Sequence, residues 1–492
     1  MKKLAVLVAQ LSNSVTYGDL NVEILGLSSD SRKIVPGSLF IALPGYRSNG
    51  REFVQDAIAQ GAVAILTEEK LPVSISQIIV PDVRKGMEEI TPYFYDYPGK
   101  KMRMIGLTGT NGKTTTTFLI HHLLESAGRN VGLIGTICSK IGGRTIPSAN
   151  TTPDVVDLHL LLHEMQMHGV TEVVMEVSSH ALALNRVVGC EFDISVFTNL
   201  TQDHLDFHYT LEEYRRAKEL LFSDFSQGEK KNKKSIINRD DEASEYFIRS
   251  ADSPVWTYGY QDGADFQVLE AHVSARGNKI KLKTPEGVKS LTSHLVGDFN
   301  VYNVLAAVSA VRAEGLTWAE IQKGLASFLG VPGRFEQVSV AKELPLVIVD
   351  YAHSPDGLKN VLETGRKLTQ GRLISVFGCG GDRDKTKRPL MGEIGAELAD
   401  VVIVTSDNPR SEDPVMIIED ILTAWEKRES LPEVFVDRQE AIQKAIQMAS
   451  PEDVVIVAGK GHETYQILKD ETIHFDDREI ARQALEEKYG VL

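Results

Sequence analysis

The sequence predicts a fold of the α/β class with three domains, the central and C-terminal ones built on largely parallel sheets. Between residues 103 and 222, short apolar runs alternate with helical stretches, which implies right-handed crossovers between parallel strands. Beyond residue 332, four continuous apolar runs each end in a polar or glycine-rich loop, as fully buried parallel strands do. Proline and glycine stand together at 98–99 and at 332–333, where they end regular structure. We therefore predict domains over residues 1–98, 99–332 and 333–492.

The first predicted domain mixes short strands with one helix. Residues 53–60 have a helical pattern, and residues 97–100 (Tyr-Pro-Gly-Lys) are expected to form a linker. Apolar runs predict strands over 39–43, 62–66 and 78–80.

The second and third predicted domains alternate strands with helices. In the second domain, strands are predicted over 103–107, 131–134, 172–177 and 193–197, and helices over 114–127, 154–168 and 211–222. Short alternating strands follow over about 255–296, and then a helix over about 299–314. In the third domain, strands are predicted over 347–349, 373–377, 401–404 and 454–457. Ligands of such parallel sheets collect at the carboxyl ends of the strands.

Composition and charge narrow the class of protein. An apolar content of 42% and a charged content of 25% over 492 residues are typical of a globular protein. The net charge of −15 argues against general affinity for nucleic acid or anionic membranes. Three widely separated cysteines (Cys138, Cys190 and Cys379) lack metal-ligand spacing and are expected to be core residues of a reduced compartment. No secretory signal or membrane span stands out, so we expect a cytoplasmic protein. We also expect it to be a monomer.

The most informative stretch is the glycine-rich segment over residues 106–117 (Gly-Leu-Thr-Gly-Thr-Asn-Gly-Lys-Thr-Thr-Thr-Thr). It follows a predicted strand and opens a predicted helix, the context in which a loop wraps the phosphates of a nucleotide such as ATP. Lys113 would neutralise phosphate, and the Thr114 hydroxyl can bind Mg²⁺. The usual first glycine is replaced by Leu107, which indicates a subclass of phosphate loop. The residues expected to bind the nucleotide here are Gly109, Thr110, Asn111, Gly112, Lys113, Thr114 and Thr115.

Two further segments of the second domain carry metal-ligand chemistry. Glu176 ends a predicted strand beside the phosphate loop, where a carboxylate can bind a metal, although a lone glutamate at a strand end is more often solvated. Residues 198–206 (Thr-Asn-Leu-Thr-Gln-Asp-His-Leu-Asp) are dense in oxygen and imidazole groups. Taken alone, His204 would more often be a structural histidine. Its place at the mouth of the same sheet favours a role in the site.

In this order, the three segments resemble the Mur ligases, the ATP-dependent amino-acid ligases of peptidoglycan precursor synthesis. The resemblance continues through residues 297–303 (Gly-Asp-Phe-Asn-Val-Tyr-Asn), 333–336 (Gly-Arg-Phe-Glu) and 350–355 (Asp-Tyr-Ala-His-Ser-Pro), and covers essentially the whole chain. It implies that ATP phosphorylates a substrate carboxylate, that an amine attacks the acyl phosphate, and that Mg²⁺ takes part. It also implies metal ligation by Thr114 and Glu176, with His204 at a second metal, and binding of the nucleotide by Asn300, Asn303, Arg334, Asp350 and His353.

Lys218 lies in a predicted helix, and from the residues alone a solvated lysine would be favoured. An ammonium group close to two Mg²⁺ ions and bound phosphate would repel the metal ions. The resemblance implies instead a carbamylated lysine, in which CO₂ converts the amine into an anionic oxygen donor of the kind that Mg²⁺ prefers. By the same resemblance Lys113, His204 and Lys218 are the expected catalytic residues.

The N-terminal domain resembles the uridine-nucleotide domain of the Mur ligases that add the third residue of the peptide. The similar residues are Ser28, Ser29, Asp30, Ser31 and Arg32, followed by the run 36–43. For Thr151 and Thr152, the helix start Thr-Thr-Pro-Asp leaves an N-cap as a second interpretation, and both roles can hold together. The resemblance implies that the UDP-linked substrate is bound by Ser31, Asn150, Thr151, Thr152, Ser178 and Arg186.

Three polar loops in the C-terminal domain are expected to form the site of the incoming amine. The loops follow predicted strands at 378–385, 405–410 and 459–463, and therefore meet at one edge of the sheet. The quartet Asp407-Asn408-Pro409-Arg410 resembles the signature of meso-diaminopimelate-adding members. A guanidinium can hold the distal carboxylate that lysine lacks, although Arg410 could instead form a salt bridge within its loop. The expected residues are Arg383, Asp407, Asn408, Pro409, Arg410, Gly459 and Glu463, with Glu463 at the distal ammonium.

The resemblance thus implies ligation of meso-diaminopimelate to the D-glutamate γ-carboxylate of UDP-N-acetylmuramoyl-L-alanyl-D-glutamate, with ATP and Mg²⁺. An L-lysine-adding ligase of the same family is the nearest alternative. A folylpolyglutamate-type ligase would share the phosphate loop but not the N-terminal module. A nucleotide-binding switch without chemistry would leave the three C-terminal loops unexplained. A nucleic-acid remodelling ATPase conflicts with the acidic charge and the absence of a basic aromatic stripe in the sequence.

Overall fold

The computed structural model describes residues 1–45, 49–274, 277–339, 343–426, 428 and 430–490. It has two compact units, one made of residues 1–267 and 305–324 and the other of residues 268–304 and 325–492. Across the part of the chain described, no helix combines the length and the apolar character that a membrane span requires. The class predicted from the sequence, α/β with several parallel sheets, is confirmed.

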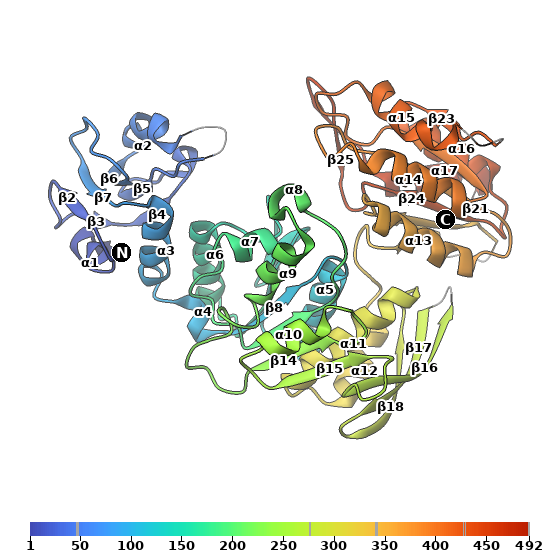
Figure 1. Ribbon diagram of the computed structural model, residues 1–492, viewed down its shortest axis with the longest axis horizontal. Helices are drawn as coiled ribbons and strands as arrows, with labels where there is room; N and C mark the ends of the chain where they lie inside the picture. Colours follow the sequence, from blue (N-terminus) through green and yellow to red (C-terminus); the bar gives the residue numbers. More distant parts are fainter. Residues whose placement is uncertain (46–48, 275–276, 340–342, 427, 429, 491–492) are drawn as a thin grey trace. The chain divides into compact units, whose positions relative to one another are not determined.

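The N-terminal part of the first unit, blue in Figure 1, is a five-stranded sheet in the order β2-β7-β6-β5-β4. Strands β4 to β7 are parallel, and β2 runs antiparallel to β7. The three predicted strands correspond to β5, β6 and β7, and the helical stretch to α2. Two helices, α1 and α3, were not predicted. The α3 segment is amphipathic, but it contains Pro92, which usually interrupts a helix. The bounds are β1 (Lys2–Lys3), α1 (Leu4–Val8), β2 (Val15–Tyr17), β3 (Glu23–Ile24), β4 (Gly26–Ser28), β5 (Ser38–Ile41), α2 (Val54–Ala59), β6 (Ala62–Thr67), β7 (Ser76–Ile79) and α3 (Val83–Phe94).

The central sheet of the first unit has the order β11-β10-β9-β12-β8-β13-β14-β15-β16. Strands β9, β12, β8, β13, β14 and β15 are parallel, and their residues are buried on both faces of the sheet. Residues 97–100 were predicted to be an irregular linker, but the short helix α4 begins at Pro98. The predicted helix over 211–222 ends earlier, at Glu219. The bounds are α4 (Pro98–Lys101), β8 (Arg103–Thr108), α5 (Lys113–Ser126), β9 (Val131–Ile134), β10 (Cys138–Ile141), β11 (Arg144–Pro147), α6 (Val155–Met167), β12 (Glu172–Glu176), α7 (Ser179–Ala183), β13 (Ile194–Phe197), α8 (Leu205–His208), α9 (Leu211–Glu219), β14 (Lys234–Asn238), α10 (Ser244–Ser250), β15 (Val255–Gly259), β16 (Phe266–Ser274), α11 (Asp298–Ala313) and α12 (Trp318–Ser327).

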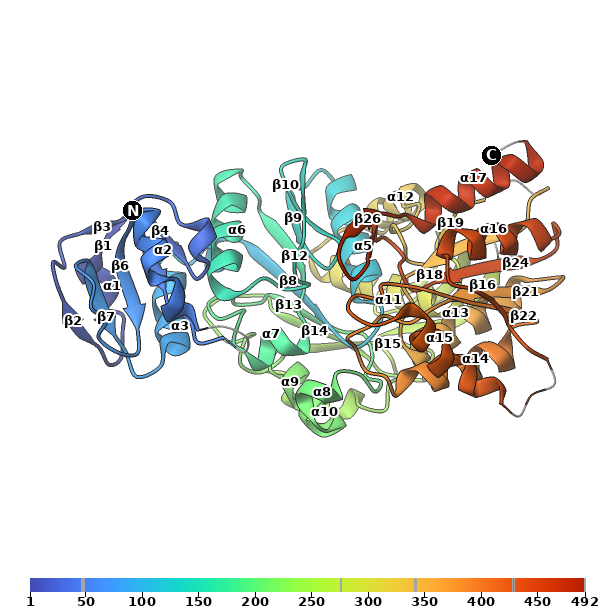
Figure 2. The same cartoon turned by 90° about the horizontal axis from the view of Figure 1, so that it is seen from above.

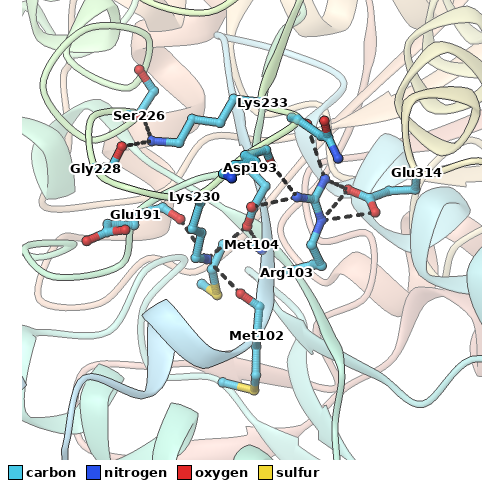
Figure 3. A network of polar contacts seen from close by, with 12 residues as sticks. Met102, Arg103, Met104, Glu191, Asp193, Ser226, Gly228, Lys230, Lys233 and Glu314 are labelled. Carbon is cyan, nitrogen blue, oxygen red and sulfur yellow. Dashed lines mark hydrogen bonds and ion pairs between the residues drawn. The ribbon is translucent and has the colours of Figure 1, made fainter.

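A buried ion network closes the amino-terminal edge of this sheet, opposite the phosphate loop (Figure 3). The fully buried Asp193 accepts hydrogen bonds from Arg103 Nη1 (2.7 Å), Met104 N (2.7 Å) and Lys230 Nζ (2.8 Å). Lys230 Nζ also donates to the carbonyl oxygens of Gly99, Met102 and Glu191. Arg103 also pairs with Glu314, at 2.8 Å, so two cations face two carboxylates and no isolated ion is buried at the strand starts.

The C-terminal part of the second unit is a six-stranded sheet in the order β19-β20-β24-β21-β22-β23, parallel except for β19. Figure 2 shows α16 and α17 on one face of this sheet and α13, α14 and α15 on the other. The four predicted strands correspond to β20, β21, β22 and β24. Because β24, β21 and β22 are adjacent parallel strands in this order, the loops that follow them are neighbours at the carboxyl edge of the sheet. The bounds are β17 (Gly277–Thr284), β18 (Gly287–Ser293), β19 (Glu336–Gln337), β20 (Leu346–Asp350), α13 (Pro355–Leu368), β21 (Leu373–Phe377), α14 (Lys387–Leu398), β22 (Val401–Thr405), α15 (Pro414–Leu422), β23 (Glu433–Phe435), α16 (Arg438–Met448), β24 (Val454–Ala458), β25 (Tyr465–Ile467), β26 (Thr472–His474) and α17 (Asp477–Tyr489).

Candidate active site

The glycine-rich segment forms a loop between β8 and the N-terminus of α5. Gly109 and Gly112 have φ values of +149° and +82°, a region that side chains other than glycine rarely adopt. A Cβ atom at Gly109 would lie 1.9 Å from Thr198 Oγ1, so this position also requires glycine for space. Lys113 Nζ lies over the loop and donates to the carbonyl oxygens of Gly109 (2.8 Å) and Thr110 (2.7 Å). The loop therefore places the N-terminus of α5 beside an ammonium group, the combination that phosphate binding uses.

Glu176 ends β12 directly beside α5 and is fully buried. Its Oε2 atom accepts hydrogen bonds from Thr114 Oγ1 and Thr136 Oγ1, both at 3.0 Å, and its Oε1 atom accepts one from Thr136 N at 2.9 Å. A carboxylate and two hydroxyl groups are hard oxygen donors that suit Mg²⁺. Among the side chains described, no three His, Cys, Asp or Glu residues cluster as a metal site. A Mg²⁺ ion here would thus complete its shell with water and phosphate oxygens, as this ion commonly does.

Lys218 lies in α9 and is only 1% exposed, so the solvated lysine that the sequence alone favoured is wrong. Its Nζ atom donates to Gly109 O at 2.8 Å and lies 4.2 Å from the ring centre of Tyr214. The same carbonyl oxygen accepts from Lys113, so two ammonium groups meet at one acceptor. Burial, together with the charge of Lys113, lowers the pKa of Lys218 well below its usual value. The neutral amine, which is the form that reacts with CO₂, is therefore favoured at this position.

Three histidines, His180, His204 and His208, lie close together around the short helix α8. His204 has a left-handed backbone (φ +54°), and its ring centre lies 4.8 Å from that of His180. His208 shares a hydrogen bond of 2.9 Å with Ser179 Oγ. Burial lowers the pKa of His204 and brings that of His180 to about 4, so these rings are neutral near pH 7. A neutral imidazole can donate a lone pair to a metal, which fits the role that the resemblance implies for His204.

The residues expected at the UDP-linked substrate come together in part around the end of β12. Thr152 Oγ1 donates to Glu176 O at 2.8 Å and accepts from Ser178 N at 3.1 Å. Arg186 Nη1 donates to Thr152 O at 3.3 Å, and Thr151 Oγ1 lies 3.0 Å from Thr136 Oγ1. The N-cap interpretation of Thr151 and Thr152 is wrong, because Asp154 caps α6. Among the contacts recorded for the described residues, none joins Ser31 or the exposed Asn150 to this cluster.

In the second unit, the residues expected at the nucleotide lie at the start of α11 and around β20. Asn300 and Asn303 are joined by a hydrogen bond of 2.8 Å between Asn303 Nδ2 and Asn300 Oδ1. Both oxygens of the buried Asp350 accept backbone N–H groups, from Phe335 (2.6 Å) and Ala352 (2.7 Å). Burial raises the pKa of Asp350. The hydrogen bond from Phe335 N to Asp350 holds the segment that carries Arg334. The remaining lone pairs of the carboxylate could accept a hydrogen bond from a hydroxyl group of a ligand.

Arg334 and His353 flank Tyr351 in the same region. The Arg334 guanidinium lies 4.4 Å from the ring centre of Tyr351, and the exposed His353 shares a hydrogen bond of 2.8 Å with Tyr351 O. A cavity of about 1060 Å³ borders Arg334 and Asn300. Its other walls include the amino-terminal ends of β20 and β24, at Leu346 and Val454.

The three loops expected to bind the amine meet at the carboxyl edge of the C-terminal sheet. A Cβ atom at Gly380 would lie 2.8 Å from Arg410 Nη1 and 3.9 Å from Arg383 Cγ, so both arginines flank this glycine. Arg410 Nη1 donates to Gly381 O at 2.9 Å, and Arg383 Nη1 donates to Asp382 O at 3.1 Å. The alternative of a loop salt bridge at Arg410 is not supported, because its recorded partners in the described chain are carbonyl oxygens. The two guanidinium groups thus retain N–H donors for a carboxylate.

The backbone at these loops is strained, which is common at binding sites. Arg410 and Asp382 have φ values of +52° and +53°. Arg410 N donates to Ile467 O at 3.1 Å, and Asp382 is held by Ser411 and Glu412. Gly459 has φ +125°, and a Cβ atom there would lie 2.4 Å from Asp407 Oδ2. Asn408 Nδ2 donates to Glu463 Oε2 at 2.9 Å, which joins the second and third loops.

Some residues of the site were not selected from the sequence. Thr136 contacts both oxygens of Glu176, and Asn199 binds both the N–H and the carbonyl oxygen of Asn111. Tyr214 lies against Lys218 and shares a hydrogen bond of 3.2 Å with Thr110 Oγ1. Thr136 could have been found from its place just after a predicted strand beside β12, whereas no sequence signal marked Tyr214.

The chain matches three sequence models of one family. The Mur ligase middle domain matches residues 107–311, the Mur ligase glutamate ligase domain matches residues 333–461, and the model described as the Mur ligase family catalytic domain matches residues 23–93.

Full-length relatives and a solved structure agree with these matches. A protein of Geobacillus thermodenitrificans named UDP-N-acetylmuramoyl-L-alanyl-D-glutamate–2,6-diaminopimelate ligase is 45% identical over 488 residues, which cover 99% of this chain and 100% of the relative. A protein of the same name from Gloeobacter violaceus is 49% identical over 471 residues, covering 95% of each chain. A solved structure of a ligase of this name has 36% sequence identity and a TM-score of 0.67, covering 96% of this chain and 97% of its own. The chain therefore belongs to the Mur ligase family.

Proposed function

We propose that this chain joins meso-diaminopimelate to the D-glutamate γ-carboxylate of UDP-N-acetylmuramoyl-L-alanyl-D-glutamate, with conversion of ATP to ADP and phosphate. The observation that carries the proposal is the pairing of acid-binding and ammonium-binding groups in one loop cluster. Arg383 and Arg410 flank Gly380, and Glu463 is tied to Asn408 of the same cluster. An amino acid with a second carboxylate and a second ammonium group matches such a set. The names of the relatives support the same substrates.

In the proposed reaction, a carboxylate oxygen of the UDP-linked substrate attacks the γ-phosphorus of ATP, and ADP leaves. The amine nitrogen then attacks the acyl carbon, loses a proton, and releases phosphate as the amide bond forms. Lys113 and the N-terminus of α5 stabilise the negative charge on the transferring phosphoryl group. We propose that Thr114, Glu176 and Thr136 hold Mg²⁺, which would supply further charge neutralisation.

An amino-acid panel tests the proposed function. Purified protein with ATP, Mg²⁺ and the UDP-linked dipeptide should release phosphate much faster with meso-diaminopimelate than with L-lysine, by about 10³-fold or more in kcat/KM. The reason is that lysine lacks the second carboxylate, and therefore the charge-assisted hydrogen bonds that Arg383 and Arg410 would make to it. Mass spectrometry of the product provides the control for uncoupled ATP hydrolysis. If lysine were the better substrate, the alternative of an L-lysine-adding ligase would replace this proposal.

We further propose that Lys218 carries a carbamate. Its burial, its lowered pKa and its position beside Lys113 support this. The neutral amine adds CO₂ and loses a proton, which gives an anion that the Lys113 ammonium group attracts. We expect Lys218→Ala to lower turnover by about 10²-fold, and we expect wild-type turnover, but not that of the variant, to rise with added bicarbonate. Full turnover of Lys218→Ala at low bicarbonate would contradict this role.

A further inference from the structure

Lys460, in the loop after β24, is a fully buried lysine among the residues of the proposed amine site. Its Nζ atom donates to Asn408 Oδ1 and to Glu463 Oε2, each at 3.1 Å. A buried ammonium group is unfavourable unless its charge and its N–H groups are paired. Both partners lie in the loops expected to bind the amine. The position of Lys460 is therefore linked to the position of two binding residues.

The contacts of Asn408 determine which way its amide group faces. Oδ1 accepts hydrogen bonds from two groups that can only donate, Lys460 Nζ and the backbone N–H of Ile467 (2.9 Å). The amide nitrogen must then face Glu463, whose Oε2 atom it reaches at 2.9 Å. A neutral side chain at position 460 would remove one of the two donors that fix this orientation.

Glu463 uses its two oxygens differently. Oε2 accepts from both Asn408 Nδ2 and Lys460 Nζ. In the described part of the chain, Oε1 has no recorded hydrogen-bond partner, and the side chain is 13% exposed. One oxygen is therefore held by protein donors, while the other is left to accept from a ligand cation.

We propose that Lys460 is a positioning residue for the incoming amino acid. It fixes Asn408 and Glu463 in the single arrangement that presents Glu463 Oε1 to an ammonium group of that substrate. The hairpin of β25 and β26 completes the arrangement, because Ile467 bonds to Asn408 through its N–H and to Arg410 N through its carbonyl oxygen. This inference rests on the proposed function of the amine site.

The test is steady-state kinetics of Lys460→Met, a side chain of similar length without a charge. We expect the KM for meso-diaminopimelate to rise by about 10- to 100-fold. The KM values for ATP and for the UDP-linked substrate should stay within about twofold, and kcat at saturating amine within about threefold. A merely structural loss would lower the amount of active enzyme and leave these KM values unchanged.

A double-mutant cycle with Glu463→Ala identifies the route of the effect. If Lys460 acts through Glu463, Lys460→Met should change the KM by less than about threefold once Glu463 is absent. Lys230→Met is the matched control, since Lys230 is a largely buried lysine that bonds to Asp193 and to carbonyl oxygens, and it belongs to the other compact unit. We expect it to lower the thermal midpoint without raising the KM for the amine.

The outcomes separate this inference from the proposed function. If the wild-type enzyme does not use meso-diaminopimelate, the proposed function fails. If it does, and Lys460→Met has an unchanged KM or raises all three KM values equally, the role of Lys460 is wrong. Should Lys460→Met fail to fold, Lys460→Gln, whose amide can still donate, is expected to raise the KM for the amine by about 3- to 10-fold. An unchanged KM in that variant would equally contradict the inference.

Discussion

Replacement of Lys113 by methionine is expected to lower kcat by about 10³-fold or more. The Lys113 ammonium group lies over the phosphate loop, where it contacts the carbonyl oxygens of Gly109 and Thr110. Bound phosphates would attract it from these neutral acceptors, because the charged acceptor is the stronger one. Without this ammonium group, the negative charge that develops on the transferring phosphoryl group is less stabilised in the transition state. Phosphate release in the presence of all substrates measures the effect.

Lys234→Met is a suitable control for Lys113→Met. Lys234 begins β14, at the opposite end of the sheet from the phosphate loop, and its Nζ atom lies 4.5 Å from the ring centre of Trp256. We expect its turnover to match that of the wild type. Near-normal turnover of Lys113→Met would show that the loop does not act on the transferring phosphate, and would remove the basis for ATP chemistry at this site.

Replacement of Arg410 by methionine is expected to lower kcat/KM for meso-diaminopimelate by about 10³-fold. In the variant, the distal carboxylate of the bound substrate would lose contact with water and would have no guanidinium partner. Leaving a charged group unpaired in this way costs more free energy than the loss of the hydrogen bond alone. The kcat/KM for L-lysine should change far less, because lysine has no such carboxylate. The measured quantity is therefore the ratio of the two kcat/KM values, which should approach one.

The control for Arg410→Met is Arg366→Met. Arg366, in α13, forms a salt bridge of 2.8 Å with Asp400, and both side chains are 42% exposed. Exposed pairs of this kind contribute little to stability, so the variant should keep wild-type kinetics and selectivity. Unchanged selectivity of Arg410→Met would mean that another group recognises the distal carboxylate.

The parallel strands were predictable because a strand buried on both faces must be apolar throughout, as at residues 373–377 and 454–457. The antiparallel hairpin of β10 and β11 was missed, although Gly142 and Gly143 between strand-like residues are a strong hairpin signal. Both glycines have positive φ values, of +51° and +83°. The short helix α4 was missed because the proline that opens it was interpreted only as a breaker.

The candidate site was predictable where one segment carries both loop and ligand chemistry, as at Lys113 and Thr114. Their partner Glu176 could be inferred from strand order, since parallel strands bring their carboxyl ends together. The role of Lys460 could not be inferred from the sequence. It depends on a hydrogen bond to Asn408, 52 positions away, which only the fold brings close to Lys460 and Glu463. The predicted domain boundaries and site roles remain predictions.

The left-handed backbone of Arg410 and Asp382 has a consequence for how the sequence can vary. Glycine or asparagine would relax both positions, so mutation under selection for heat resistance alone would drift toward them. If Arg410 binds the substrate as we propose, selection for catalytic activity would oppose that drift at position 410 and less strongly at position 382. Ancestral reconstruction or deep mutational scanning should therefore reveal two neighbouring sites with the same geometry and unequal tolerance.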